Sequence, residues 1–271
     1  MPELPEVETV KNGLIEQDLL GKRIDEVVFL RNNLRNTLPS SLPEYFKNAK
    51  ILQISRRAKY ILIHTEIGVL LSHLGMTGTW RFEEKIYSQK KHDHIEIHFC
   101  NKVLIYNDPR RFGFFDFFKL SDVKNKYLDH LGPEPLSSSF SAEYLVQKST
   151  NRIIPIKNLI MDQKIVVGVG NIYACEALFR AGIRPEKKSC TMNSSQFELL
   201  VEDIKDVLNE ALIAGGSTIS DFKQAGGESG YFQNEFHVYG RESEPCYICF
   251  SEIQNISLGG RSSFYCKSCQ K

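Results

Sequence analysis

Four cysteines near the end of the chain have the spacing of a metal site, C-x2-C-x16-C-x2-C. A two-residue gap lets both thiolates of a pair face one ion, and two such pairs supply the four soft ligands of tetrahedral zinc. Because four thiolates leave no open position on the ion, we expect one structural Zn²⁺. The glycine pair at 259–260, followed by the run SSFY, predicts a two-stranded zinc ribbon. The predicted ligands are Cys246, Cys249, Cys266 and Cys269.

The first residues of the chain could carry a nucleophile. Removal of Met1 would leave Pro2 with a free secondary amine, and an α-amino group has a pKa near ~8, so part of it is neutral in the cell. Such an amine can attack an electrophilic carbon and form an iminium ion. Glu3 and Glu6 lie beside it in the sequence and could move or orient protons. The competing interpretation is an ordinary helix start, and composition alone favours it.

Hydrophobic periodicity predicts the elements that must position these residues. Residues 5–20 have helical spacing, whereas 24–120 contain short alternating runs that predict an antiparallel β-sandwich. The breaker-rich segment LGPEP at 131–135 marks a domain boundary. After it, helical spacing returns at 142–149, 156–161, 173–181 and 194–214.

Composition sets limits on the class of protein. The chain has 271 residues, with 34 Lys and Arg against 33 Asp and Glu, so its net charge of +1 does not by itself demand a nucleic acid. No stretch reaches the ~18 uncharged apolar residues of a membrane-spanning helix, and the acidic N-terminus is no secretory signal. We therefore expect a cytosolic protein without a membrane partner.

Blocks of sequence that follow one another along nearly the whole chain resemble a single enzyme family. They are MPELPEVETV at 1–10, RRAKY at 56–60, HLGM at 73–76, KHDH at 91–94, DPRRFG at 108–113, LGPEPL at 131–136, VVGVGNIYA at 166–174, GYF at 230–232, VYGR at 238–241 and the four cysteines. On these motifs the chain resembles the bacterial formamidopyrimidine-DNA glycosylases (Fpg, also called MutM), which repair oxidised purines in DNA.

The resemblance implies a multidomain α+β fold. Its parts are an N-terminal helix plus antiparallel β-sandwich at 1–133, a helical DNA-binding domain with a helix–two-turns–helix element at 134–235, and a zinc-ribbon finger at 236–271. Damaged double-stranded DNA would lie between the two halves of a monomer. The location implied is the bacterial cytoplasm, at the nucleoid.

The resemblance also implies a bifunctional glycosylase and AP lyase. Pro2 would attack C1′ of the damaged nucleotide, the base would leave, and β- and δ-eliminations would cut the strand. Glu3 matches the acid/base carboxylate at the sugar, and Glu6 matches the acid that organises the site. Lys59 matches the lysine that binds phosphate and assists proton transfer. Arg261 in the ribbon matches the arginine linked to δ-elimination.

DNA contacts follow from the same motifs. Base chemistry in a duplex requires extrusion of the nucleotide, and Met76, Arg110 and Phe112 match the residues that fill the resulting void. The loop at 224–230 matches the lesion-recognition loop. The phosphate contacts implied are His73, His92, Arg152, Lys157 and Asn171.

Two alternatives remain open on the sequence. An endonuclease VIII-type glycosylase would act on oxidised pyrimidines, but members of that branch typically have Gly where Leu4 stands. A non-catalytic zinc-ribbon DNA-binding protein would be expected if the N-terminal or lysine motif were degraded, and both motifs are intact. The sequence does not reveal the preference among oxidised purines or the preferred opposite base.

Overall fold

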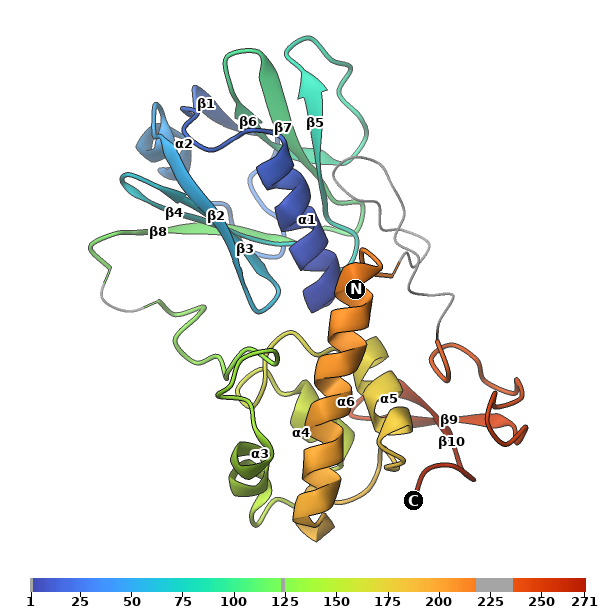
Figure 1. The fold of residues 1–271 in the computed structure, drawn as a ribbon. Coiled ribbons are helices and arrows are strands. Elements are labelled where there is room, and N and C mark those ends of the chain that lie inside the picture. The colour runs from blue at the N-terminus through green and yellow to red at the C-terminus, as the bar shows by residue number, and fades with distance from the viewer. Residues whose placement is uncertain (1, 123–124, 218–235) are drawn as a thin grey trace. The chain divides into compact units, whose positions relative to one another are not determined.

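The computed structural model describes residues 2–122, 125–217 and 236–271 (Figure 1). The chain divides into two compact units. One comprises Met1–Asp129 and Ala214–Tyr231, and the other comprises His130–Ile213 and Phe232–Lys271. The first break lies four residues from the predicted boundary at 133. In the second unit the C-terminal ribbon clusters with the helices, through Cys175 and Phe179 on one side and Val238, Cys246 and Ile253 on the other.

The first unit is a β-sandwich with a helix at its N-terminal end, as the sequence predicts (Figure 1). One antiparallel sheet has the order β1-β6-β7-β5 and the other the order β2-β3-β4-β8. The elements are α1 (Leu4–Glu16), β1 (Glu26–Phe29), α2 (Leu42–Phe46), β2 (Ile51–Arg57), β3 (Tyr60–Thr65), β4 (Gly68–His73), β5 (Thr79–Glu84), β6 (Asp93–His98), β7 (Lys102–Asn107) and β8 (Phe114–Lys119).

The two sheets and α1 share one hydrophobic core. Val7, Val10 and Leu14 of α1 lie in the same buried cluster as Ile61 of one sheet and Leu104 of the other. The helix ends earlier than predicted, at Glu16 instead of residue 20. Asp18 takes a left-handed conformation (φ 56°), which interrupts the helical path, and Leu19 then turns into the core.

The second unit is helical, with a ribbon at its C-terminal end (Figure 1). Its elements are α3 (Ala142–Ser149), α4 (Ile156–Met161), α5 (Asn171–Arg180), a 3-10 turn (Ser189–Thr191), α6 (Ser194–Ile213), β9 (Ile253–Leu258) and β10 (Arg261–Cys266). Helices α4 and α5, joined by turns, form the predicted helix–two-turns–helix element. Within the described residues, every helix is too short or too polar to cross a bilayer.

Helix α6 carries an acidic group whose ionisation opposes folding. Burial raises the pKa of Asp203 to about 6, and the negative charges of Asp206, Glu202 and Glu210 act in the same direction, although Arg180 opposes them. This cost in the free energy of folding is absent below the unfolded pKa of ~3.9, grows as the pH rises toward 6 and is complete above it.

We therefore expect Asp203→Asn to raise the free energy of unfolding by about 1 kcal/mol at pH 8, after allowance for partial exposure to solvent. The gain should be about one third as large at pH 4.5, because the cost grows with pH only between the unfolded and the folded pKa of Asp203. Urea unfolding of both proteins at the two pH values measures it. An equal gain at both would show that ionisation is not its source.

Candidate functional site

The start of α1 is a buried, hydrogen-bonded turn. Pro2, Glu3 and Glu6 are all buried, and the Glu3 amide donates to Glu6 Oε2 at 2.8 Å. The other carboxylate oxygen, Glu6 Oε1, accepts from the amide and the hydroxyl of Ser217 at 2.8 and 2.9 Å. Because Glu6 holds the residue directly after Pro2, it fixes the direction in which the chain leaves the proline.

The hairpin between β2 and β3 carries Lys59 and is tied to α1. Ala58 at its turn has a left-handed backbone (φ 54°), and Lys59 beside it is buried. Arg56 donates to Ala58 O at 2.8 Å and, from Nε, to Glu8 Oε2 of α1 at 2.7 Å. Burial works against ionisation of Glu8, but hydrogen bonds from Lys11 and Arg56 outweigh it and lower the pKa. This ion pair places the Lys59 hairpin beside α1, the helix that starts two residues after Pro2.

His73 ends β4 opposite the first residue of β3. It pairs with Tyr60, and the two rings meet edge to face with their centroids 5.1 Å apart. Burial lowers the pKa of His73 to about 4, and the positive charges of Lys59 and Arg35 act in the same direction. The imidazole is therefore neutral near pH 7. Since Nδ1 accepts the Gly75 amide at 2.9 Å, Nε2 carries the proton and can donate to an anion such as a phosphate.

Two loops bring the predicted void-filling residues together. Gly75 has φ +65°, and a Cβ at this position would lie 2.3 Å from the carbonyl carbon of Phe112, so the β4–β5 loop packs directly on the β7–β8 loop. Met76 follows Gly75 on the first loop. On the second loop, the Arg110 guanidinium lies over the ring of Phe112, 4.8 Å from its centroid, and Phe112 is 45% exposed. The tertiary structure thus brings the loop of Met76 and the loop of Arg110 and Phe112 into contact.

Asp108 holds these loops in place and is a residue that the sequence analysis missed. Its buried carboxylate accepts from the Thr77 hydroxyl at 2.6 Å and from the Gly113 amide at 2.7 Å. Its backbone N–H donates to the carbonyl of His92 at 3.0 Å, and its own carbonyl accepts from His94 Nε2 at 2.9 Å. His92 therefore lies beside the Arg110 loop. The Asp-Pro pair signals a turn, but no sequence pattern shows that its carboxylate joins two loops.

In the second unit, Lys157 joins two predicted phosphate-binding elements. Its ammonium group is buried and donates to Asn171 Oδ1 at 2.6 Å, to Ser262 O at 2.9 Å and to Ser263 Oγ at 2.7 Å. Asn171 Nδ2 also donates to Ser262 O, at 3.0 Å. Asn171 begins α5, whereas the two serines lie in β10. Because an ammonium group has three protons to donate, we expect Lys157 to act through Asn171 and the ribbon rather than on phosphate directly.

Lys157→Met should test this arrangement. Methionine keeps the length of the side chain but makes none of the three hydrogen bonds, so we expect the free energy of unfolding of the second unit to fall by about 2 kcal/mol. DNA binding should weaken as Asn171 and the ribbon lose their common anchor. Urea unfolding and a binding titration measure both effects. Lys188→Met, at an exposed lysine of the same unit, is the control, and an equal loss there would contradict the assignment.

Arg261 begins β10, directly after the ribbon turn. Gly259 and Gly260 have φ values of +56° and +73°, as a two-residue hairpin turn requires. A Cβ at Gly259 would lie 3.2 Å from the Asn158 amide nitrogen, so this turn packs on α4. Asn158, Gly259 and Arg261 are among the residues that line a cavity of about 240 Å³.

Two further predicted elements stand apart from these clusters. Arg152 is exposed, and its carbonyl accepts from the Ser189 hydroxyl at 2.8 Å. No contact in the described part of the second unit joins its side chain to Lys157 or Asn171. The predicted lesion-recognition loop at 224–230 lies outside the described residues.

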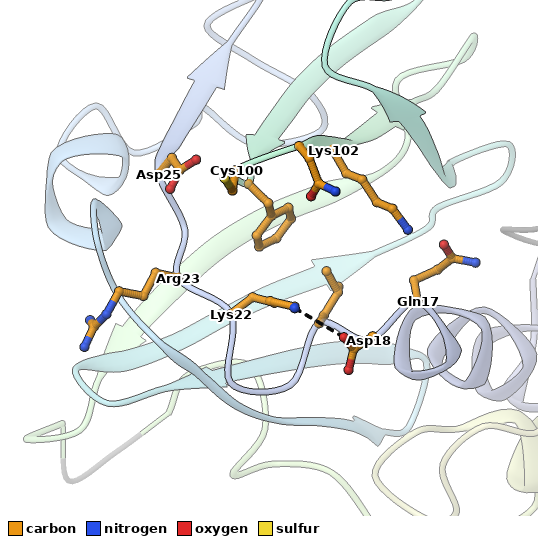
Figure 2. Close-up of a pocket in the computed structure, with 10 residues that line it drawn as sticks. Gln17, Asp18, Lys22, Arg23, Asp25, Cys100 and Lys102 are labelled. Atoms are coloured by element: carbon orange, nitrogen blue, oxygen red, sulfur yellow. Dashed lines mark ion pairs between the residues drawn. The ribbon is translucent and has the colours of Figure 1, made fainter.

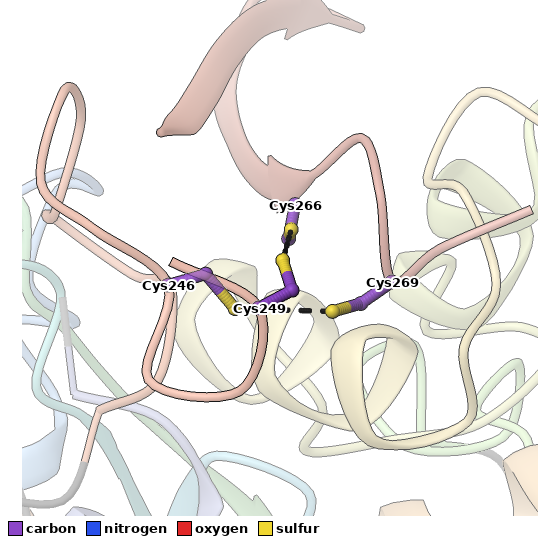
Figure 3. A group of neighbouring side chains, drawn as sticks. All are labelled: Cys246, Cys249, Cys266 and Cys269. Atoms are coloured by element: carbon purple, nitrogen blue, oxygen red, sulfur yellow. Dashed lines mark hydrogen bonds between the residues drawn. The ribbon is translucent and has the colours of Figure 1, made fainter. Parts of the chain in front are cut away.

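The four predicted zinc ligands converge at the end of the ribbon (Figure 3). Their sulfur atoms all lie within 4.8 Å of one another, and Cys246 and Cys266 are buried. The Cys246–Cys269 and Cys249–Cys266 sulfur pairs are 3.9 and 3.4 Å apart. Zinc–sulfur bonds of about 2.3 Å give a tetrahedron with edges of about 3.8 Å, so the cluster fits zinc. In the described part of the chain, no other group of His, Cys, Asp or Glu has this geometry.

A cavity of about 290 Å³ lies at the other end of α1 (Figure 2). It is lined by charges of both signs, several already paired: Lys22 lies 3.2 Å from Asp18, and Arg23 lies 2.9 Å from Glu66. A helix of 13 residues is about 20 Å long, which separates this cavity from Pro2. None of the predicted site residues lines it.

Two stretches of the chain match domains of a known protein family. The Formamidopyrimidine-DNA glycosylase N-terminal domain matches residues 1–115, and the Formamidopyrimidine-DNA glycosylase H2TH domain matches residues 131–223. Fold and site together thus define a DNA glycosylase of the helix–two-turns–helix class. The chain belongs to the formamidopyrimidine-DNA glycosylase family, which confirms the resemblance noted in the sequence.

Individual relatives agree with this assignment over their whole length. The chain is 48% identical to the formamidopyrimidine-DNA glycosylase of Bdellovibrio bacteriovorus, covering 100% of both chains. Its fold matches the wild-type Lactococcus lactis enzyme in complex with DNA containing N7-benzyl-Fapy-dG, with a TM-score of 0.92, 35% identity and full coverage of both chains. A complex of the same enzyme with DNA containing an oxidised pyrimidine matches with a TM-score of 0.91 and 34% identity, again over both whole chains.

Proposed function

We propose that this DNA-repair glycosylase excises oxidised purines, 8-oxoguanine and formamidopyrimidines, from duplex DNA and then cleaves the strand, with Pro2 as its nucleophile. The observation that carries the proposal is the buried turn of Pro2, Glu3 and Glu6, joined through Glu8 and Arg56 to the hairpin of Lys59. A buried turn held by hydrogen bonds is what a nucleophile needs to stay in position for attack.

The proposed reaction conserves atoms and charge at each step. After loss of Met1, the Pro2 nitrogen bonds to C1′ while the bond from C1′ to the base breaks, and the base leaves protonated. The C1′–O4′ bond then breaks, and the sugar oxygen takes up the proton that the proline nitrogen releases. The resulting iminium ion makes the 2′ proton acidic. Loss of that proton expels the 3′ phosphate, and a second elimination expels the 5′ phosphate. Glu3 would move protons at the sugar, and Lys59 would hold phosphate and assist proton transfer.

Two groups of residues would bind the DNA. Met76, Arg110 and Phe112 lie on two packed loops and would fill the space left by the extruded nucleotide. His73, with its proton on Nε2, and His92 would contact phosphates from the first unit. Asn171, Arg152 and Arg261 would do so from the second, with Lys157 behind Asn171. One structural zinc would be held by the four cysteines, and a monomer in the bacterial cytoplasm, at the nucleoid, would suffice for the reaction.

Trapping with borohydride tests the proposal. The reductant converts an iminium ion into a stable amine, so the wild-type protein should become covalently attached to a duplex that contains 8-oxoguanine. A duplex with an oxidised pyrimidine, run in parallel, tests the endonuclease VIII alternative, and an undamaged duplex is the control. Base release without a trapped adduct would rule out the amine mechanism, whereas preferential trapping of the pyrimidine lesion would favour the alternative.

A further inference from the structure

A short loop between β1 and α2 is built as a rigid platform. Asn33 and Thr37 form an isolated antiparallel bridge, and the Leu38 amide donates to the Asn32 carbonyl at 2.9 Å. At the tip, the Leu34 amide donates to the Asn36 carbonyl at 2.9 Å. The Leu34 side chain is buried in the core of the sandwich. A loop with this many internal bonds and an anchored tip holds its neighbouring side chains in a narrow range of positions.

The same loop is attached to the edge of the candidate site. The Arg35 amide donates to the Gly113 carbonyl at 3.0 Å, and the Asn36 side-chain amide donates to the Phe115 carbonyl at 2.9 Å. Gly113 ends the loop of Arg110 and Phe112, and its amide nitrogen would lie 2.4 Å from a Cβ placed on Gly75. Since the Gly75 amide donates to His73 Nδ1, a series of contacts runs from the Arg35 backbone through Gly113 and Gly75 to the His73 ring.

The Arg35 side chain is exposed, and its charge reaches the candidate site. It opposes the effect of burial on the pKa of Tyr60 and adds to the lowering of the pKa of His73. In residues 2–122, 125–217 and 236–271, no carboxylate lies within ion-pair distance of Arg35, and its guanidinium makes no hydrogen bond to the protein. Within these described residues, the five N–H donors of the guanidinium have no protein acceptor.

Charge and chemistry identify the class of ligand. The positive charges of Lys59 and Arg35 both lower the pKa of His73, whose ring is neutral near pH 7. A planar guanidinium can bind two oxygens of a phosphodiester at once, and the neutral His73 offers one more donor. The arrangement suits a single phosphate of a nucleic-acid backbone.

From these contacts we propose that Arg35 binds a backbone phosphate of the DNA beside Lys59 and His73, as an additional member of the site. The inference rests on the proposed function for its ligand. It does not depend on the chemistry at Pro2.

The test is the salt dependence of binding to a duplex that contains a tetrahydrofuran abasic analogue. For Arg35→Gln, we expect binding about 5- to 10-fold weaker near 150 mM salt and a plot of log K against log salt that is flatter by about 0.9, because one fewer phosphate is neutralised. Arg35→Lys should keep the slope but restore the affinity only in part. Arg23→Gln is the matched control, because the Arg23 guanidinium is already bonded to Glu66 and to the Asn48 carbonyl.

A second measurement tests the geometry without DNA. Arg35→Gln should raise the pKa of His73 above its value of about 4, which an NMR titration of the His73 ring measures, whereas Arg23→Gln should leave it unchanged. An unaltered salt slope in Arg35→Gln would overturn the proposal, as would an unaltered His73 titration. If the wild type excises no lesion, the proposed function fails, but the salt slopes still decide the role of Arg35.

Discussion

Displacing the N-terminal amine by one residue should abolish base excision. Pro2→Gln introduces a large second residue, so Met1 should be retained and the amine moved by about 3.8 Å. A nucleophile that far from C1′ cannot reach the geometry of attack, and we expect excision of 8-oxoguanine to fall by about 10³-fold or more. The borohydride adduct should disappear with it. Product analysis on gels and mass spectrometry of the N-terminus measure the two effects.

The controls separate a lost nucleophile from a lost fold. Pro2→Gln should bind a tetrahydrofuran duplex within about threefold of wild type, because the phosphate contacts lie elsewhere. Asn12→Ala, at an exposed position of α1, should leave excision unchanged. Strand scission at the wild-type rate by a protein shown to retain Met1 would rule out Pro2 as the nucleophile.

Loss of one zinc ligand should unfold the ribbon and remove tight DNA binding. Structural zinc contributes about 10–16 kcal/mol of binding free energy in small zinc domains, which exceeds what the short β9–β10 hairpin can supply from its own contacts. For Cys266→Ser, we expect zinc to fall from about one per chain to near zero. Arg261 and the β10 anchor of Lys157 would be lost with the ribbon, so DNA affinity should fall by about 100-fold.

Elemental analysis and limited proteolysis of residues 236–271 measure this outcome. Cys100→Ser is the matched control, because Cys100 is an exposed cysteine of the first unit and its replacement should change neither zinc content nor affinity. A Cys266→Ser protein that retains stoichiometric zinc and a protease-resistant ribbon would contradict the four-cysteine assignment.

The sequence predicts an element well where its hydrophobic periodicity continues over many residues. Helix α6 follows one apolar stripe from Ser194 to Ile213 and was predicted to within a residue. By contrast, α2 spans only Leu42–Phe46, five residues, and was missed within a region read as strands. Five residues are barely more than one helical turn, too few to show a 3.6-residue period. The end of α1 was placed too late, because the left-handed Asp18 leaves no trace in the hydrophobic pattern.

Sequence alone determined what depends on residue type and short spacing: the four thiolates, the family motifs, the terminal proline with its two carboxylates, and the alternation of the strands. Tertiary structure decided which of these residues meet and which are removed from water. It made Lys157 a buried anchor between α5 and the ribbon, and it packed the loop of Met76 on that of Phe112. Both results depend on contacts between segments far apart in the chain, whose burial and hydrogen bonding are set by packing and leave no periodic mark on the sequence.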